Sequence, residues 1–143
     1  MPKSQVFAND LMLAILQGTG IPNLLDNAAS NPATVLYLSL HTADPGVAGN
    51  QATNEATYTG YSRMAIARTA AGWTVSNTVA TNTAQITFPA CTSGNNGITY
   101  AAVGTAASGA GMVLYSGALS QPLQVSAGIT PIISPGTLSV TEA

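Results

Sequence analysis

Ionisable side chains are scarce in this sequence. Lys, Arg, Asp and Glu make up 6% of its 143 residues, against roughly 25% in an ordinary soluble domain. Disorder does not account for the shortage, because 46% of the chain is hydrophobic and its formal net charge is only −2, whereas disordered chains combine low hydrophobicity with high charge. The surface must therefore consist of short neutral residues, which cost little to bury against another protein.

Cysteine, histidine and basic residues are just as rare. Cys91 is the single cysteine, so it forms no internal disulfide, and we expect it to be a small buried hydrophobe. The three basic residues lack the positive footprint of a nucleic-acid binder. No apolar run approaches the roughly 20 residues that span a bilayer. We therefore expect neither nucleic acid nor a membrane as a partner.

Few residues in this sequence could take part in catalysis or metal binding. Any Ser-His-acid arrangement must include His41, the single histidine, which precedes Asp44 and a loop carrying Asn54 and Glu55. These oxygen ligands are also the place where calcium would bind, but no calcium-loop signature is present, and no glycine motif cradles a phosphate. We expect no catalytic residue, no cofactor and no metal; His41 is predicted to be structural, and Arg63 to pair with Glu55 or Asp44.

The first twenty residues have helical periodicity. Phe7, Leu11 and Ile15 recur at helical spacing over residues 5–17, and Gly18 stands where a helix commonly ends. This apolar stripe is predicted to contact either the protein's own sheet or a neighbouring molecule. We expect residues 1–33 to form a helix and connector arm, and residues 34–143 to form a β-sandwich domain.

From Thr34 onward the apolar residues alternate with a period of two. Turn-forming Gly, Asn and Pro clusters separate short segments of this kind, which is typical of a sandwich or barrel. The sequence predicts an all-β, jelly-roll-like sandwich of about eight antiparallel strands with one N-terminal α-helix. The expected strands cover 34–41, 61–69, 72–76, 83–89, 97–105, 111–119, 122–127 and 136–142.

Aromatic residues offer an alternative function. If they lay together on an exposed face, they would form a platform on which sugar rings stack. The competing prediction is ordinary cross-strand packing inside the sandwich. The residues concerned are Tyr37, Tyr58, Tyr61, Trp73, Tyr100 and Tyr115.

Four phrases of the sequence resemble the small virion proteins of tailed bacteriophages that are often labelled tail-fibre-like. They are LYLSLHTADPG (36–46), NEATYTGYSRMAIART (54–69), NTAQITFPA (82–90) and LYSGALSQPLQVSAGITPIISPGTLSV (114–140). The resemblance covers residues 35–141 and leaves the helix outside the shared pattern. Where these proteins often have A-G-D-T-P, this chain has Ala127 to Pro131 with Ile129 in place of the carboxylate.

The resemblance implies a jelly-roll protein present in many copies on a phage particle. It is similar in particular to the jelly-roll cement proteins of short-tailed phages such as the Bordetella phage. The implied function is that of a capsid cement or decoration subunit, which binds the major capsid protein and copies of itself, as a dimer or trimer, on the outer surface of the capsid. The alternative is a tail-fibre or minor tail protein with a receptor-binding or glycan-binding role.

Overall fold

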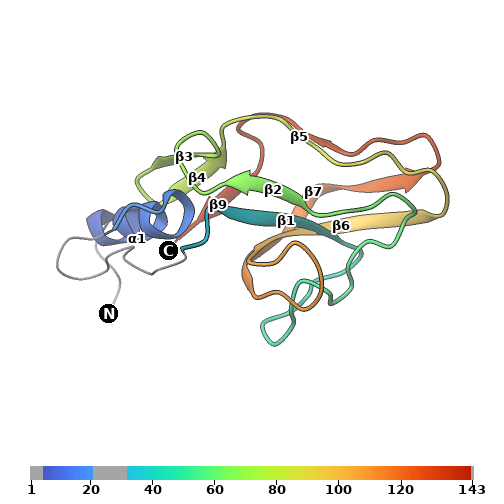
Figure 1. The fold of residues 1–143 in the computed structure, drawn as a ribbon, viewed down its shortest axis with the longest axis horizontal. Coiled ribbons are helices and arrows are strands. Elements are labelled where there is room, and N and C mark those ends of the chain that lie inside the picture. The colour runs from blue at the N-terminus through green and yellow to red at the C-terminus, as the bar shows by residue number, and fades with distance from the viewer. Residues whose placement is uncertain (1–4, 21–31, 143) are drawn as a thin grey trace. The chain divides into compact units, whose positions relative to one another are not determined.

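The computed structural model describes residues 5–20 and 32–142. Within these residues one helix precedes nine strands, so the mostly-β class with one N-terminal helix is confirmed (Figure 1). The elements are α1 (Gln5–Gln17), β1 (Val35–His41), β2 (Met64–Ala67), β3 (Trp73–Ser76), β4 (Val79–Asn82), β5 (Ile86–Thr87), β6 (Asn95–Gly104), β7 (Val113–Ser126), β8 (Ile132–Ile133) and β9 (Ser139–Thr141).

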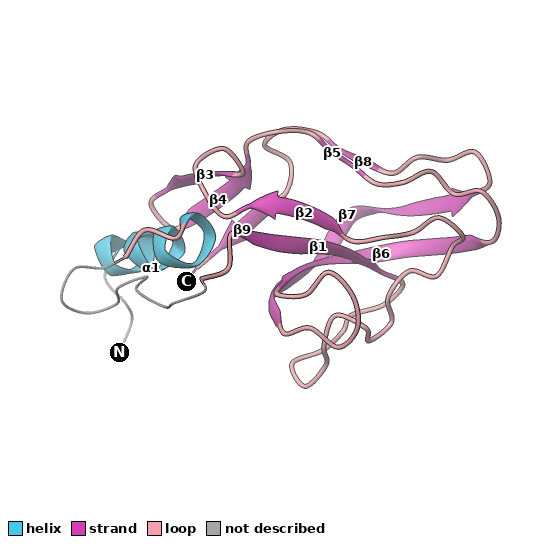
Figure 2. Ribbon diagram, viewed as in Figure 1, coloured by secondary structure: helices cyan, strands magenta, loops and turns pink. Residues whose placement is uncertain are grey.

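The strands form three sheets. The largest has the order β2-β1-β6-β7, the second has the order β3-β4-β9, and β5 pairs with β8 (Figure 2). Within them, β1 with β6, β6 with β7, β3 with β4 and β4 with β9 are all antiparallel. The jelly-roll connectivity within the all-β class stays a prediction.

The chain divides into two compact units. One joins residues 1–35, 66–85 and 133–143, and the other joins residues 36–65 and 86–132. Each unit has its own buried residues. The division into an arm over 1–33 and a domain over 34–143 stays a prediction.

In the first unit, α1 packs on β3 and β4. Met12 and Leu16 on the helix and Trp73 on β3 are fully buried. The Gln17 side-chain amide also donates a hydrogen bond to the Trp73 carbonyl at 2.8 Å. The helix therefore supplies part of the core of its own unit.

The end of α1 is closed by a glycine and an arginine. Gly18 has a φ of 68°, a left-handed conformation that glycine adopts without steric cost. Arg68 donates from Nε to the Ile15 carbonyl at 2.6 Å and from a terminal nitrogen to the Ala14 carbonyl. The last carbonyls of a helix have no partner within it, so Arg68 satisfies groups that the helix itself leaves open.

The second unit is built on the central strands β1 and β6. Leu36, Leu38 and Leu40 are buried on one face of β1, as the alternation predicts. Leu38 lies opposite Val103, and Leu40 lies opposite Ala101. Both β1 and β6 are paired with a strand on each side. This double pairing fixes the points at which the loops after β1 and after β6 leave the sheet.

Two strands differ from the sequence prediction because of turn-like residues. Asn77 has a φ of 56° in the two-residue loop that joins β3 to β4, so residues 79–82 form a strand that the sequence prediction missed. The predicted break before Pro122 is wrong. There β7 continues, and between Ile98/Leu123 and Tyr100/Ala118 it holds more residues than β6, an irregularity that accommodates proline on an edge strand.

Several other boundaries were predicted too generously or not at all. The strands β2 and β5 are shorter than the expected 61–69 and 83–89, because only their central residues join a ladder. The two-residue strand β8 falls in a stretch that was not predicted as a strand. Such short pairings depend on the partner segment more than on local alternation.

We predict that Leu16→Ala destabilises the protein far more than Leu11→Ala. Leu16 is fully buried, whereas Leu11 on the same helix is only half-buried. Removing a buried leucine side chain costs about 2–5 kcal/mol, and the exposed part of Leu11 loses less contact. Urea unfolding of the two variants measures the difference, and equal losses would contradict the placement of Leu16 in the core.

Candidate functional site

The long loop after β1 is anchored by a buried ion pair. Arg63 donates from Nε to Glu55 Oε1 at 2.6 Å and from a terminal nitrogen to Oε2 at 2.8 Å. The Arg63 side chain is only 2% exposed and that of Glu55 17%. This two-point geometry is the strongest form of carboxylate recognition by arginine. The predicted pairing of Arg63 is thus confirmed, with Glu55 as the partner.

The remaining donors of Arg63 bind the loop that follows β6. One terminal nitrogen donates to the Ala106 carbonyl at 2.9 Å, and the other donates to the Gly109 carbonyl at 2.6 Å. The hydrogen bonds to Glu55 raise the pKa of Arg63, an effect opposed by its burial. Arg63 therefore stays charged and joins two loops that are far apart in the sequence.

Tyr61 completes the surroundings of the carboxylate. Its hydroxyl donates to Glu55 Oε1 at 2.9 Å and accepts from the Leu40 backbone N–H at 3.1 Å. Its ring lies parallel to that of Phe88, with the centroids 6.3 Å apart. Burial raises the pKa of Tyr61 well above its usual value. The hydroxyl thus stays protonated and acts as a fixed donor.

His41 is fully buried, and both of its ring nitrogens have partners. Nδ1 lies 2.8 Å from the Thr53 carbonyl, and Nε2 lies 2.8 Å from the Ser39 hydroxyl. A carbonyl only accepts, so Nδ1 carries the proton in the neutral ring, and Nε2 accepts from Ser39. The pKa of His41 is lowered, because burial disfavours the charged ring. The Thr53 carbonyl and Glu55 oppose this effect but are weaker.

The Ser39 and His41 side chains have the spacing of a nucleophile and its base. Both residues are 0% exposed, however, and the Ser39 hydroxyl also lies 3.2 Å from the Ala102 carbonyl. A substrate has no access to either group in this conformation. The pair instead fixes the end of β1 to the residues around Thr53, as expected of a structural histidine.

Gln51 is a further anchor that sequence reasoning missed. It is fully buried, donates from its amide to the Tyr37 carbonyl at 3.2 Å, and accepts from the Ala106 N–H at 3.0 Å. A Cβ at Gly104 or Gly111 would overlap its side chain. Gly104 and Gly111 therefore make room for the Gln51 side chain.

The oxygen groups considered above as possible calcium ligands are engaged in other contacts. Both oxygens of Glu55 bind Arg63, Asp44 Oδ1 accepts from the Gly46 N–H at 2.8 Å, and the Asn54 amide donates to the Asp44 carbonyl at 3.0 Å. Over residues 5–20 and 32–142, no three His, Cys, Asp or Glu side chains gather in one place. The carboxylate of Glu55 is neutralised within the protein, which makes it a poor cation ligand.

The aromatic residues do not form one platform. Trp73 and Tyr58 are buried. By register, Tyr100 lies opposite His41 and Tyr37 lies opposite Gly104, whereas Tyr115 lies opposite Val103 on the other face of the sheet. Packing within the protein accounts for Trp73 and Tyr58, whereas the other four aromatic residues are half-buried.

Of the apolar stripe predicted on α1, formed by Phe7, Leu11 and Ile15, the described residues are exposed to solvent only in part. Leu11 and Ile15 are half-buried, and the Phe7 side chain lies outside the described part of the structure. The helix residues that pack inward are Ala8, Met12, Ala14 and Leu16. A contact with another molecule through Phe7, Leu11 and Ile15 stays a prediction.

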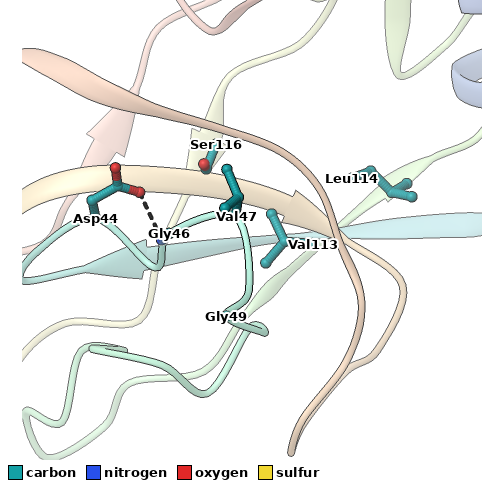
Figure 3. A pocket seen from close by; sticks show the side chains of 7 residues that line it. All are labelled: Asp44, Gly46, Val47, Gly49, Val113, Leu114 and Ser116. Carbon is teal, nitrogen blue, oxygen red and sulfur yellow. Dashed lines mark hydrogen bonds between the residues drawn. The ribbon is translucent and has the colours of Figure 1, made fainter.

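A shallow groove lies between the loop after β1 and the beginning of β7. Figure 3 shows Val47 next to Val113, with Asp44 turned back to its hydrogen bond with Gly46. Val47 is fully exposed. The other residues that line it are Gly49, Leu114 and Ser116. The lining has both polar and apolar surface, and its single ionisable residue, Asp44, is hydrogen-bonded to the Gly46 N–H.

The comparison with protein families decides the identity. Residues 7–141 match the family described as Podophage GP4 fiber I protein gp80. The chain belongs to this family. It is therefore a structural protein of a phage virion. The match begins at residue 7, so the family pattern includes the helix, which the resemblance had left outside.

No curated protein matches the chain. In the described residues, no helix has the length and apolar character to cross a membrane.

We predict that Glu55→Gln destabilises the protein by about 3 kcal/mol, because it leaves the Arg63 charge buried without its partner. Asp44→Asn is the matched control: Asp44 is exposed in the same loop, and an amide oxygen can still accept from Gly46, so we expect a change within about 0.5 kcal/mol. Urea unfolding at pH 7 compares them. Similar losses in the two variants would argue against the ion pair as the anchor.

Stability should also depend on pH through His41. The unfolded chain binds a proton near the ordinary pKa of 6.5, whereas burial lowers the pKa in the folded protein. Protonation therefore favours unfolding, and the free energy of unfolding falls as the pH drops below about 6.5. We expect His41→Gln to abolish this slope between pH 7 and 5.5 in urea unfolding. A slope that persists in the variant would show that other groups cause it.

Proposed function

We propose that this protein is a non-enzymatic structural subunit of the phage fibre. The observation that carries the proposal is the family match over residues 7–141, whose description names a fibre protein. The match spans nearly the whole chain, so the helix and the strands fall within a single family pattern. A fibre subunit needs a stable scaffold and contact surfaces, and it needs no catalytic centre.

The geometry of the polar residues supports a non-enzymatic role. His41 and Ser39 are buried, and Glu55 is neutralised by Arg63. An active site requires groups that reach a substrate, with pKa values suited to proton transfer. In this protein, the side chains of Ser39, His41, Glu55 and Arg63 form hydrogen bonds to one another or to backbone carbonyls. Such contacts stabilise the fold.

A capsid cement role on the outer surface of the head has weaker support. Its basis is the resemblance of the sequence phrases, and the neutral surface suits packing against the major capsid protein as well as against fibre subunits. The description of the matching family favours the fibre. A glycan-binding role is also weakened, because Trp73 and Tyr58 are buried.

Electron microscopy of virions tests the location. We expect particles made without this protein to lack density on the fibres, and particles carrying a C-terminally tagged copy to bind anti-tag gold there. The copy number per virion, from quantitative mass spectrometry, should match the fibres. Loss of density from the head, with a copy number near that of the major capsid protein, would overturn the proposal in favour of a cement subunit.

A further inference from the structure

The buried hydroxyl of Ser39 lies close to two atoms that can accept its hydrogen. One is Nε2 of His41 at 2.8 Å, and the other is the Ala102 carbonyl oxygen at 3.2 Å. A serine hydroxyl has a single hydrogen, so it donates fully to only one of them. In the neutral ring Nδ1 donates to the Thr53 carbonyl at 2.8 Å, and the hydroxyl hydrogen points to Nε2. The Ala102 carbonyl is then the acceptor that Ser39 leaves unused.

A second proton on the ring would reverse this arrangement without breaking it. A charged imidazole donates from both nitrogens, and a hydroxyl oxygen accepts as well as donates. We propose that Ser39 and His41 form a proton-operated switch inside the folded protein, in which proton uptake at Nε2 reverses their hydrogen bond and turns the Ser39 hydroxyl to Ala102. The contact with Thr53 is the same in both states, so the loop after β1 stays anchored.

The ionisable groups around His41 are compatible with a charged ring. Glu55 forms a backbone bridge with His41 and attracts the charged ring, whereas Arg63 repels it, and the attraction is the larger of the two. The Tyr61 hydroxyl is bound to Glu55, Tyr100 lies opposite on β6, and neither β2 nor β7 carries a charged side chain. Burial is the main effect and lowers the pKa of His41, so the ring titrates below its ordinary pKa.

The alternative is a proton switch that releases the loop. It would require the charged ring to hold one N–H without an acceptor, which is costly in a buried site. Ser39 supplies that acceptor and passes its own hydrogen to Ala102. The geometry therefore favours a switch that keeps the loop in place. Since His41 is 0% exposed, the proton reaches it from solvent through transient local opening.

NMR of the wild-type protein tests the switch, because His41 is the single histidine. Well above pH 6.5, the ordinary pKa, we expect the ring to carry its proton on Nδ1. At lower pH we expect both ring nitrogens to be protonated in a spectrum that is still that of the folded protein. The Ala102 carbonyl carbon should shift with the same midpoint. A neutral ring protonated on Nε2, an Ala102 signal that does not respond, or protonation only on unfolding would each overturn the proposal.

The variant Ser39→Ala removes the oxygen on which the switch depends. The charged ring then loses a charge-assisted hydrogen bond and the neutral ring only an ordinary one, so we expect about tenfold weaker proton binding by the folded protein. The matched control is Ser116→Ala, because Ser116 lies opposite Ala102 on β7 and is exposed. Its midpoint should equal that of the wild type. An unchanged midpoint in Ser39→Ala would contradict the proposal, and the wild-type titration decides the question if this variant does not fold.

Urea unfolding gives an independent readout. Relative to His41→Gln, the unfolding equilibrium constant of the wild type should rise by up to about tenfold per pH unit below pH 6.5. The rise should stop below the midpoint found by NMR, because the folded and unfolded chains then both hold the proton. A rise that continues would show that the folded protein cannot hold it. Neither test depends on the position in the virion, so both are separate from the test of the fibre role.

Discussion

The buried pair of Arg63 and Glu55 is the interaction on which the second unit depends. The segment between β1 and β2 contains no regular strand, so it is held by scattered backbone hydrogen bonds, such as that from the Ala56 N–H to the Leu40 carbonyl, and by side chains. A buried ion pair is stabilising only when its remaining donors are satisfied. Arg63 meets this condition, because its other hydrogen bonds go to the carbonyls of Ala106 and Gly109. One side chain thereby fixes two loops at once.

The same use of charge appears in the first unit and explains the neutral surface. Arg68 binds carbonyls at the end of α1, so both arginines bind groups of their own unit. In a chain with 6% charged residues, the use of Arg63, Glu55 and Arg68 in internal contacts leaves few charges for the surface. Neutral surfaces repel one another weakly and lose little hydration on contact. The scarcity of charge therefore affects both how this protein folds and how its surface associates with other proteins.

The periodicity of apolar residues predicted those elements whose structure follows from their own local sequence. The helix over 5–17 and the strand at 35–41 were found because burial on one face gives a clear period. The strand β4 was missed since Asn77 and Asn82 resemble turn residues. Asn82 is in fact buried, and its amide donates to the Ala84 and Ser134 carbonyls. Its role depends on a distant segment, which no local pattern contains. The pairing of Arg63 was predicted because so few charges were available to choose from.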